Sequence, residues 1–508
     1  MDFPLNWPTR DLLSHRAAAT PERTGLIDAD DGKTATYRRL DGWAECVAKS
    51  FVARGIEPGD AIGMVAGTRL GFADVFHAAM RLRTTLFLLN PELPASELGS
   101  QVERADLDCL ICEADTEKTV VEAAGDVPIY TFDTPEHEDV GWLDRPMQGI
   151  GDVPRITRDW TQLGMFTSGT TGGPKCVRLT TGNLMASATA SAFRLGVNPG
   201  DRWLVCLPMY HMGGLAPVVR STLYGTTVVL QRGFDEQETQ RVIEAYDVTG
   251  VSLVPTMLAR LLDAGWTPPT HLRFVLVGGA PTPPELIERC EQHGVPIYPS
   301  YGATETASQI ATATPEQAFE HPEAVGNPLL FTDVCILSDG ERCEPGEPGE
   351  IVVRGPTVSP GYLGEEATKA GFDEQGLYTG DLGYLDDEGR LWVVGRADDA
   401  ILTGGETVHP ATVVDVVRSH PVVSDAAVVG LEDPEWGERV GALVVPVDSG
   451  PAVDVEMLTE YCRDQLARFA VPKTWAVVDD LPRTPSGTID REATVVKLNE
   501  ERGSPENE

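Results

Sequence analysis

Short apolar runs alternate with longer segments of helical length over most of the first 395 residues. The runs are rich in β-branched residues, which is typical of strands buried on both faces, and residues 70–83 predict an amphipathic helix. Strands are expected at residues 61–65, 107–112, 162–166, 203–207, 227–230, 250–254 and 274–277. This alternation predicts an α/β fold built on largely parallel sheets.

The pattern changes at two points farther along the chain. Residues 333–354 contain closely spaced strands separated by Pro/Gly turns, which predict a small β subdomain. After Gly395 the pattern restarts as a compact α+β unit, with helices expected over residues 410–419 and 455–466 and strands over 426–429, 442–447 and 475–478. We therefore predict a large N-terminal domain over residues 1–395, a small C-terminal domain over 396–498 and an acidic tail over 499–508. Residues 133–160, rich in Asp, Glu, Pro and Gly, predict a surface connection inside the large domain.

The chain is strongly acidic. It has 78 acidic against 40 basic residues among 508, a formal net charge of −38, and only seven of the basic residues are lysines. Such a charge repels nucleic acid and anionic membrane surfaces, so neither is expected as a partner. Because the carboxylates are spread along the whole sequence, we favour adaptation to a salt-rich cytoplasm over one acidic face for a basic partner. In this respect the composition resembles that of haloarchaeal proteins.

The N-terminal residues contain no apolar core of a signal peptide, and no apolar run approaches the ~18–20 residues that span a bilayer. The nine cysteines are scattered singly, which is typical of reduced, buried thiols. Cys109 and Cys112 form one close pair in an apolar run without histidines at ligand spacing, so a structural role is favoured over a zinc or redox site. We predict a cytoplasmic protein.

The strongest chemical signal is the run Thr167-Ser168-Gly169-Thr170-Thr171-Gly172-Gly173-Pro174-Lys175. Glycines let the backbone turn its N–H groups toward an anion, the hydroxyls add donors and Lys175 supplies a cation. The run follows the strand expected at 162–166, the position at which phosphate loops usually lie. No Gly-Lys-Ser/Thr sequence follows at Walker spacing. We therefore predict a phosphate-binding loop of another kind, with a flexible surface turn as the alternative.

This loop resembles the phosphate loop of the acyl-adenylate-forming superfamily of acyl-CoA synthetases. Other motifs of that superfamily follow in the same order: residues 208–214 (PMYHMGG), 278–281 (GGAP), 300–306 (SYGATET), 378–381 (YTGD) and 395–399 (GRADD). The resemblance therefore covers nearly the whole chain. It implies that a small-molecule carboxylic acid is activated with ATP and Mg²⁺ as an acyl-adenylate and then transferred to coenzyme A.

The same resemblance implies roles in binding the nucleotide. The β- and γ-phosphates are expected to contact Thr167, Ser168, Gly169, Thr170, Thr171, Gly172 and Lys175, of which Thr170 and Lys175 are catalytic. Three further residues are expected to be catalytic: Thr304 to bond the α-phosphate, Glu305 to coordinate Mg²⁺, and His211 to flank the acyl pocket. The adenine is expected at Gly279, Ala280, Tyr301 and Gly302, and the ribose at Asp381 and Arg396. Taken alone, Glu305 fits a capping carboxylate, Asp381 a turn residue and His211 a core histidine.

For the transfer to coenzyme A, the resemblance implies that the C-terminal domain swings about a hinge at Asp398 and that Gly405 lines the pantetheine tunnel. One departure affects adenylation: the superfamily places a catalytic lysine where this chain has Thr488. Either Lys473 or Arg491 compensates, or adenylation is weak, or thioester formation is the more efficient half-reaction. A smaller departure is Cys176, where the superfamily usually has glycine.

Several stretches resemble the 2-succinylbenzoate–CoA ligases of menaquinone biosynthesis. They are residues 201–204 (DRWL), 220–225 (RSTLYG), 300–310 (SYGATETASQI) and 403–406 (TGGE). That acid carries a benzoate carboxylate that must stay unactivated, and Arg220, Ser308 and Gln309 are candidates to bind it. A surface position is the alternative for Arg220. A medium-chain or aryl acid–CoA ligase, or an adenylate-binding protein impaired by Thr488, remain the alternative functions.

Overall fold

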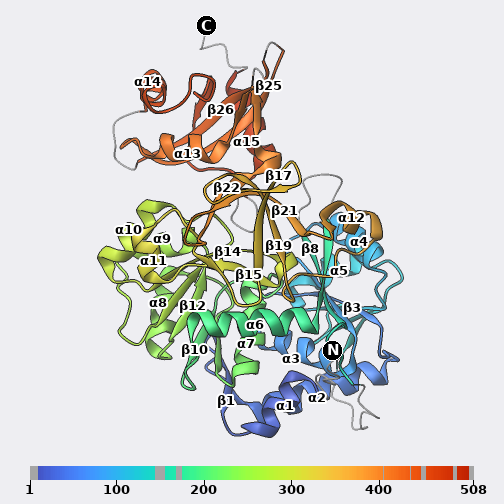
Figure 1. Cartoon of the computed structure of the whole chain (residues 1–508). Coiled ribbons are helices and arrows are strands. Elements are labelled where there is room, and N and C mark those ends of the chain that lie inside the picture. Colours follow the sequence, from blue (N-terminus) through green and yellow to red (C-terminus); the bar gives the residue numbers. More distant parts are fainter. Residues whose placement is uncertain are drawn as a thin grey trace. The chain divides into compact units, whose positions relative to one another are not determined.

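The computed structural model describes residues 10–143, 155–167, 174–403, 406–434, 436–447, 453–483 and 489–502 (Figure 1). The chain divides into two compact units. The first comprises Met1–Val334 and Val353–Leu377, and the second comprises Cys335–Val352 and Tyr378–Glu508.

Two sheets form the framework of the first unit. The strands of one are β1 (Thr24–Asp28), β2 (Thr34–Thr36), β10 (Arg202–Val205), β11 (Thr227–Leu230), β12 (Gly250–Leu253), β13 (Phe274–Val277), β14 (Ile297–Ala303), β15 (Ser308–Thr312) and β16 (Asn327–Pro328). The strands of the other are β3 (Ala61–Val65), β4 (Thr85–Leu89), β5 (Cys109–Cys112), β6 (Ile129–Thr131), β7 (Val140–Trp142), β8 (Thr161–Thr167) and β9 (Lys175–Thr180). Their orders are β16-β15-β14-β13-β12-β10-β11-β1-β2 and β7-β6-β5-β3-β4-β8-β9.

Neighbouring strands are parallel from β14 to β1 in the nine-stranded sheet and from β7 to β8 in the seven-stranded sheet. Antiparallel pairs occur toward the edges, at β1/β2, β14/β15, β15/β16 and β8/β9. Parallel sheets require cover on both faces, which explains why their strands read as continuous apolar runs. The predicted α/β class with largely parallel sheets is confirmed.

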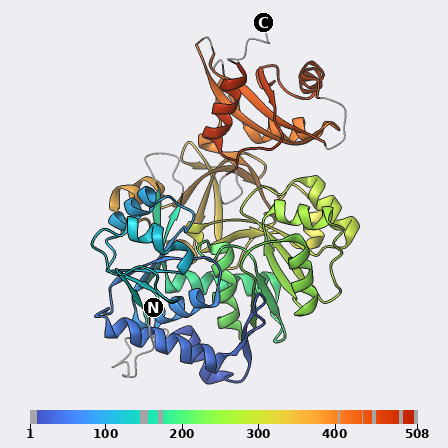
Figure 2. The same ribbon diagram turned by 180° about the vertical axis from the view of Figure 1, so that it is seen from behind.

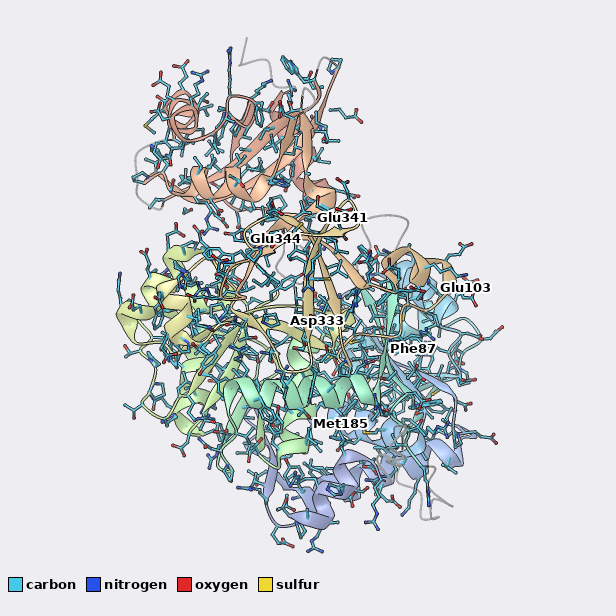
Figure 3. The ribbon with its side chains drawn as sticks, in the orientation of Figure 1. Phe87, Glu103, Met185, Asp333, Glu341 and Glu344 are labelled. Atoms are coloured by element: carbon cyan, nitrogen blue, oxygen red, sulfur yellow. The ribbon has the colours of Figure 1, made fainter. Side chains whose placement is uncertain are left out.

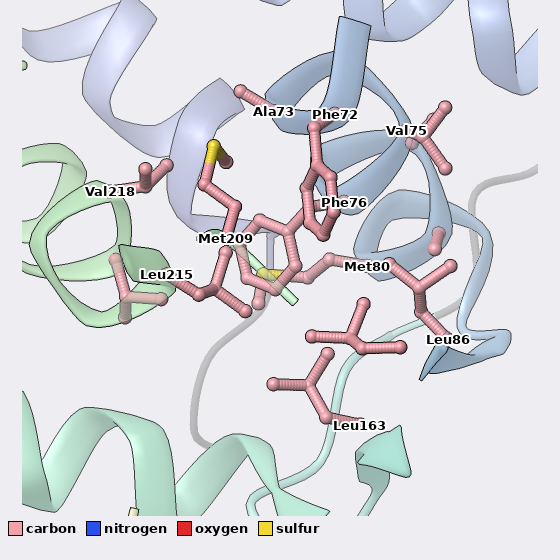
Figure 4. Close-up of a cluster of buried hydrophobic side chains, with 14 of the residues drawn as sticks. Phe72, Ala73, Val75, Phe76, Met80, Leu86, Leu163, Met209, Leu215 and Val218 are labelled. Carbon is pink, nitrogen blue, oxygen red and sulfur yellow. The ribbon is translucent and has the colours of Figure 1, made fainter. Parts of the chain in front are cut away.

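One set of helices lies between the two sheets (Figure 1). It includes α2 (Tyr37–Ala53), α3 (Leu70–Leu82), α6 (Thr181–Leu195) and α7 (Met212–Tyr224), with α1 (Leu12–Ala19) beside them. Their apolar side chains join strand residues of both sheets in one core, in which Phe72, Phe76 and Met80 of α3 pack near Leu163 and Leu215 (Figure 4). The two sheets are therefore held together by a shared hydrophobic interior.

The outer faces of the two sheets have separate helical cover (Figures 1 and 2). On the seven-stranded sheet these helices are α4 (Ala95–Ala105) and α5 (Glu117–Ala123). On the nine-stranded sheet they are α8 (Glu236–Ala245), α9 (Pro255–Asp263), α10 (Pro284–His293) and α11 (Pro315–Glu320). The short helix α12 (Glu365–Gly371) follows later in the chain.

A capping box fixes the start of α6 directly after β9. The Thr180 side chain accepts a hydrogen bond from the Asn183 amide at 3.1 Å, and Asn183 Oδ1 accepts one from the Thr180 amide at 2.8 Å. Asn183 Nδ2 also donates to the carbonyls of Pro356 and Val358, at 2.9 and 2.8 Å. The helix start thereby anchors the segment that leads to Tyr362.

The later strands form two further sheets. One has the order β18-β17-β19-β21-β20, with β22 paired to β21, and the other has the order β24-β23-β26-β25, with β27 paired to β26. The first consists of β17 (Asp333–Ser338), β18 (Glu341–Arg342), β19 (Gly349–Arg354), β20 (Phe372–Asp373), β21 (Gly376–Leu385) and β22 (Leu391–Arg396). The second consists of β23 (Ile401–Thr403), β24 (Glu406–Val408), β25 (Val423–Asp433), β26 (Gly437–Pro446) and β27 (Thr474–Val477).

Three helices cover the C-terminal sheet. Side chains of α13 (Pro410–Arg418) and α14 (Val455–Gln465) join one core cluster, and Leu498 of α15 (Arg491–Arg502) joins another. The strands expected within 333–354 and the α+β pattern after Gly395 are therefore present. Helix α15 was not predicted, because its exposed positions are strongly polar and few apolar residues mark its buried side. It includes the first residues of the segment expected to be a tail.

The segment 133–160, expected to be a surface connection, contains the short strand β7. This strand extends the seven-stranded sheet by pairing in parallel with β6, through Ile129 and Val140 among others. Asp, Pro and Gly on both sides concealed it in the sequence, because three residues are too few for a periodic signal.

The nine cysteines are all free, and seven of them are buried. Cys109 and Cys112 are three residues apart on β5, so they face opposite sides of the sheet and belong to different core clusters. Burial raises the pKa of each thiol to about 12. A structural role for this pair agrees with the sequence-based interpretation.

Acidic side chains are spread over the surface. Glu103, Asp333, Glu341 and Glu344 are exposed, whereas Phe87 and Met185 are buried (Figure 3). Among the described helices, none has the length and apolar character needed to cross a bilayer.

Candidate active site

The predicted phosphate loop lies between two antiparallel strands of the seven-stranded sheet. Thr167 ends β8 and Lys175 begins β9, and the two residues pair across the strands, with Thr167 Oγ1 donating to the Lys175 carbonyl at 3.3 Å. Ser168, Gly169, Thr170, Thr171 and Gly172 lie outside the described residues. The adjacent Cys176 is buried, and burial raises the pKa of its thiol to about 12. This cysteine is a core residue of the strand.

Lys175 and Glu305 contact the same side chain, that of Tyr362. Lys175 Nζ lies 5.3 Å from the centre of the Tyr362 ring, and the Tyr362 hydroxyl donates to Glu305 Oε1 at 2.9 Å. The structure thus brings together two predicted residues that are distant in sequence. Sequence reasoning missed Tyr362; the available signal was an aromatic residue enclosed by glycines in Gly361-Tyr362-Leu363-Gly364.

Thr304 and Glu305 lie in a tight turn between β14 and β15. Thr304–Thr306 form one 3₁₀ turn, closed by the Thr306 hydroxyl, which lies 3.0 Å from the Ala303 carbonyl. A Cβ on Gly302 would lie 1.9 Å from the Ser308 carbonyl oxygen, so only glycine fits there. The Glu305 carboxylate contacts the Tyr362 hydroxyl, which argues against a purely helix-capping role.

The turn continues through two residues with unusual backbone angles. Ala307 has φ 54° and Ser308 has φ 131°, a region that non-glycine residues rarely adopt. The Ser187 hydroxyl, from α6, donates to the Ala307 carbonyl at 2.9 Å. The fold therefore holds the backbone of Ser308 in a strained conformation.

The predicted adenine-binding residues lie at the carboxyl ends of two neighbouring parallel strands. Gly279 and Ala280 come after β13, and Tyr301 and Gly302 lie near the end of β14. A Cβ on Gly278 would lie 2.9 Å from the Ser300 carbonyl oxygen, which shows how closely the two segments approach. The carboxyl ends of parallel strands are the usual position of ligand sites in α/β folds.

His211 precedes the first residue of α7. It is half-buried, its ring centre lies 4.6 Å from that of Tyr210, and burial lowers its pKa. A Cβ on Gly214 would lie 2.3 Å from the Pro208 carbonyl oxygen, so this glycine is required for the turn that enters the helix. Partial exposure distinguishes His211 from a fully enclosed core histidine.

Arg220 lies on α7 and is only 1% exposed, so the alternative of a surface arginine was wrong. Its Nη2 donates to Ser308 Oγ at 3.1 Å, and its guanidinium carbon lies 5.2 Å from the Trp203 ring centre. Burial lowers its pKa to about 10, which leaves it charged at neutral pH. Among the residues described, no carboxylate forms an ion pair with it, and its buried Nε has no hydrogen-bond partner.

Gln309 points away from this pair. Successive residues of a strand face opposite sides, and Gln309 Nε2 donates to Thr312 Oγ1 at 2.8 Å. Of the three residues predicted to bind the spare carboxylate, the structure brings together Arg220 and Ser308.

In the second unit, Asp381 and Arg396 are paired across β21 and β22. Their side chains form an ion pair at 3.3 Å, and the Gly380 amide before them donates to Glu350 Oε1 at 3.1 Å. The two residues predicted to bind the ribose are therefore neighbours. Gly405, Thr488 and the side chain of Asp398 lie outside the described residues.

The two cations considered as substitutes for the missing lysine both have partners. Lys473 Nζ lies 4.4 Å from the Trp436 ring centre, and Arg491 forms an ion pair with Asp399. Arg491 Nη2 also lies 3.4 Å from the Asp399 carbonyl.

Within the part of the chain that the structure describes, no three His, Cys, Asp or Glu residues form a metal-binding cluster. A single carboxylate such as Glu305 nevertheless fits Mg²⁺ that arrives with a nucleotide, because this ion commonly takes one or two protein carboxylates and fills its shell with phosphate oxygens and water.

The sequence matches two family models, AMP-binding enzyme over residues 13–363 and AMP-binding enzyme C-terminal domain over residues 414–488. It is 40% identical over 493 residues to 2-succinylbenzoate–CoA ligase of Bacillus licheniformis, covering 97% of this chain and 99% of that protein. The enzyme of the same name from Bacillus subtilis is 38% identical over 490 residues, 96% of each chain.

Solved structures agree. The o-succinylbenzoate CoA synthetase of Bacillus subtilis in complex with its acyl-adenylate intermediate superposes with a TM-score of 0.88 at 37% identity, covering 96% of this chain and 98% of that one. Its complex with ATP and magnesium gives 0.87 at 37% identity, covering 95% and 98%. The chain belongs to the AMP-binding enzyme family.

Proposed function

We propose that the protein is a 2-succinylbenzoate–CoA ligase, an AMP-forming enzyme of menaquinone biosynthesis that uses ATP, Mg²⁺ and coenzyme A. Similarity to enzymes of that name over nearly the full length of the chain supports this function. The choice of acid rests on one observation: Arg220 is a buried cation that lies beside Ser308 and has no carboxylate partner among the described residues.

A buried charge normally needs a counter-charge, because desolvation is costly. We propose that the ring carboxylate of 2-succinylbenzoate supplies it, with Arg220 and Ser308 as donors and with His211 beside the acyl chain. The space lined by Arg220, Leu184 and Ala216 has a volume of only about 10 Å³, about the size of one water molecule. Substrate binding must therefore move the wall of this gap. A medium-chain acid has no second carboxylate to occupy it.

In the first half-reaction, an oxygen of the succinyl carboxylate attacks the α-phosphorus of ATP. The bond to the oxygen that bridges the α- and β-phosphates breaks, and pyrophosphate leaves. We assign the β- and γ-phosphates to the loop at 167–175 and the α-phosphate to Thr304. Bound magnesium offsets phosphate charge, and Glu305 offers it a carboxylate oxygen.

We place the adenine at Gly279, Ala280, Tyr301 and Gly302, and the ribose at Asp381 and Arg396. The carboxylate of Asp381 is suited to accept hydrogen bonds from both ribose hydroxyls, and Arg396 is its immediate neighbour on β22.

In the second half-reaction, the sulfur of coenzyme A attacks the acyl carbonyl carbon. A C–S bond forms, the C–O bond to AMP breaks, and the thiol proton is released. We propose that residues 396–498 act as a mobile domain that turns about Asp398 between the two half-reactions and brings Gly405 to the pantetheine arm.

A thioester assay with ATP, coenzyme A and a panel of acids, run in molar salt, tests the proposal. Robust turnover of 2-succinylbenzoate, with little of octanoate or benzoate, would support it. Turnover of only the other acids would point to a medium-chain or aryl acid–CoA ligase. ATP binding without turnover would point to a protein impaired in adenylation by Thr488. We further propose a cytoplasmic location, because ATP and coenzyme A are cytoplasmic substrates and the cysteines are free thiols.

A further inference from the structure

Tyr362 is the only side chain that the described contacts place against both Lys175 and Glu305. The hydroxyl donates to Glu305 Oε1 at 2.9 Å, and the ring face lies 5.3 Å from Lys175 Nζ. The first contact is a hydrogen bond to an ionised acceptor, and the second is a cation–π contact. One residue therefore connects the lysine after the phosphate loop with the carboxylate assigned to magnesium.

The backbone around Tyr362 is held firmly on both sides. Tyr362 pairs with Val177 of β9, the Leu363 amide donates to the Cys176 carbonyl at 2.7 Å, and the Arg178 amide donates to the Gly361 carbonyl at 3.1 Å. The ring is 6% exposed and packs edge-to-face on Phe372, with ring centres 5.5 Å apart. The direction of the hydroxyl is thus determined by the sheet.

Glu305 is held from a second side as well. Its carbonyl accepts a hydrogen bond from the Ser359 amide at 2.7 Å, and the Ser359 hydroxyl donates to the Arg178 carbonyl at 2.6 Å. The segment from Ser359 to Tyr362 therefore fixes both the backbone and the carboxylate of Glu305. Mg²⁺ tolerates little deviation from octahedral geometry, so a carboxylate of fixed orientation binds it better than a rotating one.

We propose that Tyr362 is a positioning residue for Mg²⁺–ATP, whose hydroxyl orients the Glu305 carboxylate while its ring supports Lys175. The inference rests on the proposed function, because it takes Glu305 as the magnesium ligand. A tyrosine with a purely structural role commonly donates to a backbone carbonyl, as the buried Tyr37 does to Ser221 at 2.8 Å. Tyr362 donates to a carboxylate of the proposed site instead.

The test is the variant Tyr362→Phe, which removes the hydroxyl and keeps the ring. ATP binding is measured by calorimetry over a series of Mg²⁺ concentrations, alongside pyrophosphate release. We expect the Mg²⁺ concentration for half-maximal ATP binding to rise about 10-fold, with the KM for 2-succinylbenzoate within about twofold of the parent value. The matched control is Tyr37→Phe, which should lower the melting temperature and leave the Mg²⁺ dependence unchanged.

The variant Glu305→Gln tests the assignment of magnesium to Glu305 separately from the role of Tyr362. If Glu305→Gln raises the Mg²⁺ requirement and Tyr362→Phe does not, the role of Tyr362 is overturned and the proposed function stands. If neither variant changes it, the assignment of magnesium to Glu305 fails too. In the double variant, the loss of the hydroxyl should have no further effect; an additive effect would show that Tyr362 does not act through Glu305.

Discussion

Replacing Arg220 by methionine tests the choice of acid most directly. Methionine has a similar length and no charge, so it removes the cation while continuing to fill the space beside Trp203. Exchanging a buried charge for an apolar side chain is often neutral or stabilising, so the folded state should survive. The variant therefore reports on recognition of the substrate.

The expected loss follows from the burial of the pair. Removing one partner of a desolvated charge pair costs about 2–5 kcal/mol, which corresponds to a decrease of about 30-fold to a few thousand-fold in kcat/KM for 2-succinylbenzoate. The loss should be smaller for Ser308→Ala, about fivefold, because a neutral hydrogen bond contributes only about 1 kcal/mol.

The control is a substrate, 4-oxo-4-phenylbutanoate, which lacks the ring carboxylate and retains the succinyl one. Initial rates of thioester formation are compared for both acids with the parent enzyme and with Arg220→Met. The preference for the dicarboxylate should collapse, while turnover of the monoacid changes little. An equal loss for both acids at an unchanged melting temperature would refute the assignment of the ring carboxylate to Arg220.

Three further outcomes are expected. Burial lowers the pKa of His77, which also lies near Asp11 and Arg81, from 6.5 to about 4. Below pH 7 the unfolded chain therefore binds a proton that the native state does not, and urea titrations should show the free energy of unfolding falling by about 2 kcal/mol between pH 7 and pH 5. A His77→Gln variant that retained the whole decrease would contradict this. Thr488→Lys should accelerate pyrophosphate release by about 10²–10³-fold if adenylation lacks a cation, and an unchanged rate would mean that another group already serves. With a net charge of −38, thermal melts should shift upward by several degrees from 0.1 M to 1 M KCl, as the Debye length falls from about 10 to 3 Å; a flat series would argue against adaptation to salt.

The sheets of the first unit were predictable because each strand is a contiguous apolar run, as at 227–230 and 274–277, where the predicted and observed bounds coincide. The burial of Arg220 was predictable in principle, since it lies in Gly214–Thr222 of α7, a stretch that is buried on every side and in which Arg220 is the one charged residue. The contact of Lys175 with Glu305 through Tyr362 was not, because it depends on the pairing of segments that are far apart in the chain. No local pattern encodes such a register.

The helices between the two sheets constrain how this protein can vary. Since α3, α6 and α7 contribute to a core shared with both sheets, each sheet and its helices form one half of this interior. A substitution in either half changes the surface against which the other half packs. Exchanging residues 10–143 alone with those of a relative would place side chains from two lineages in one interior. Productive recombination should therefore favour crossover points that keep both sheets together, and drift in one half should be accompanied by compensating changes in the other.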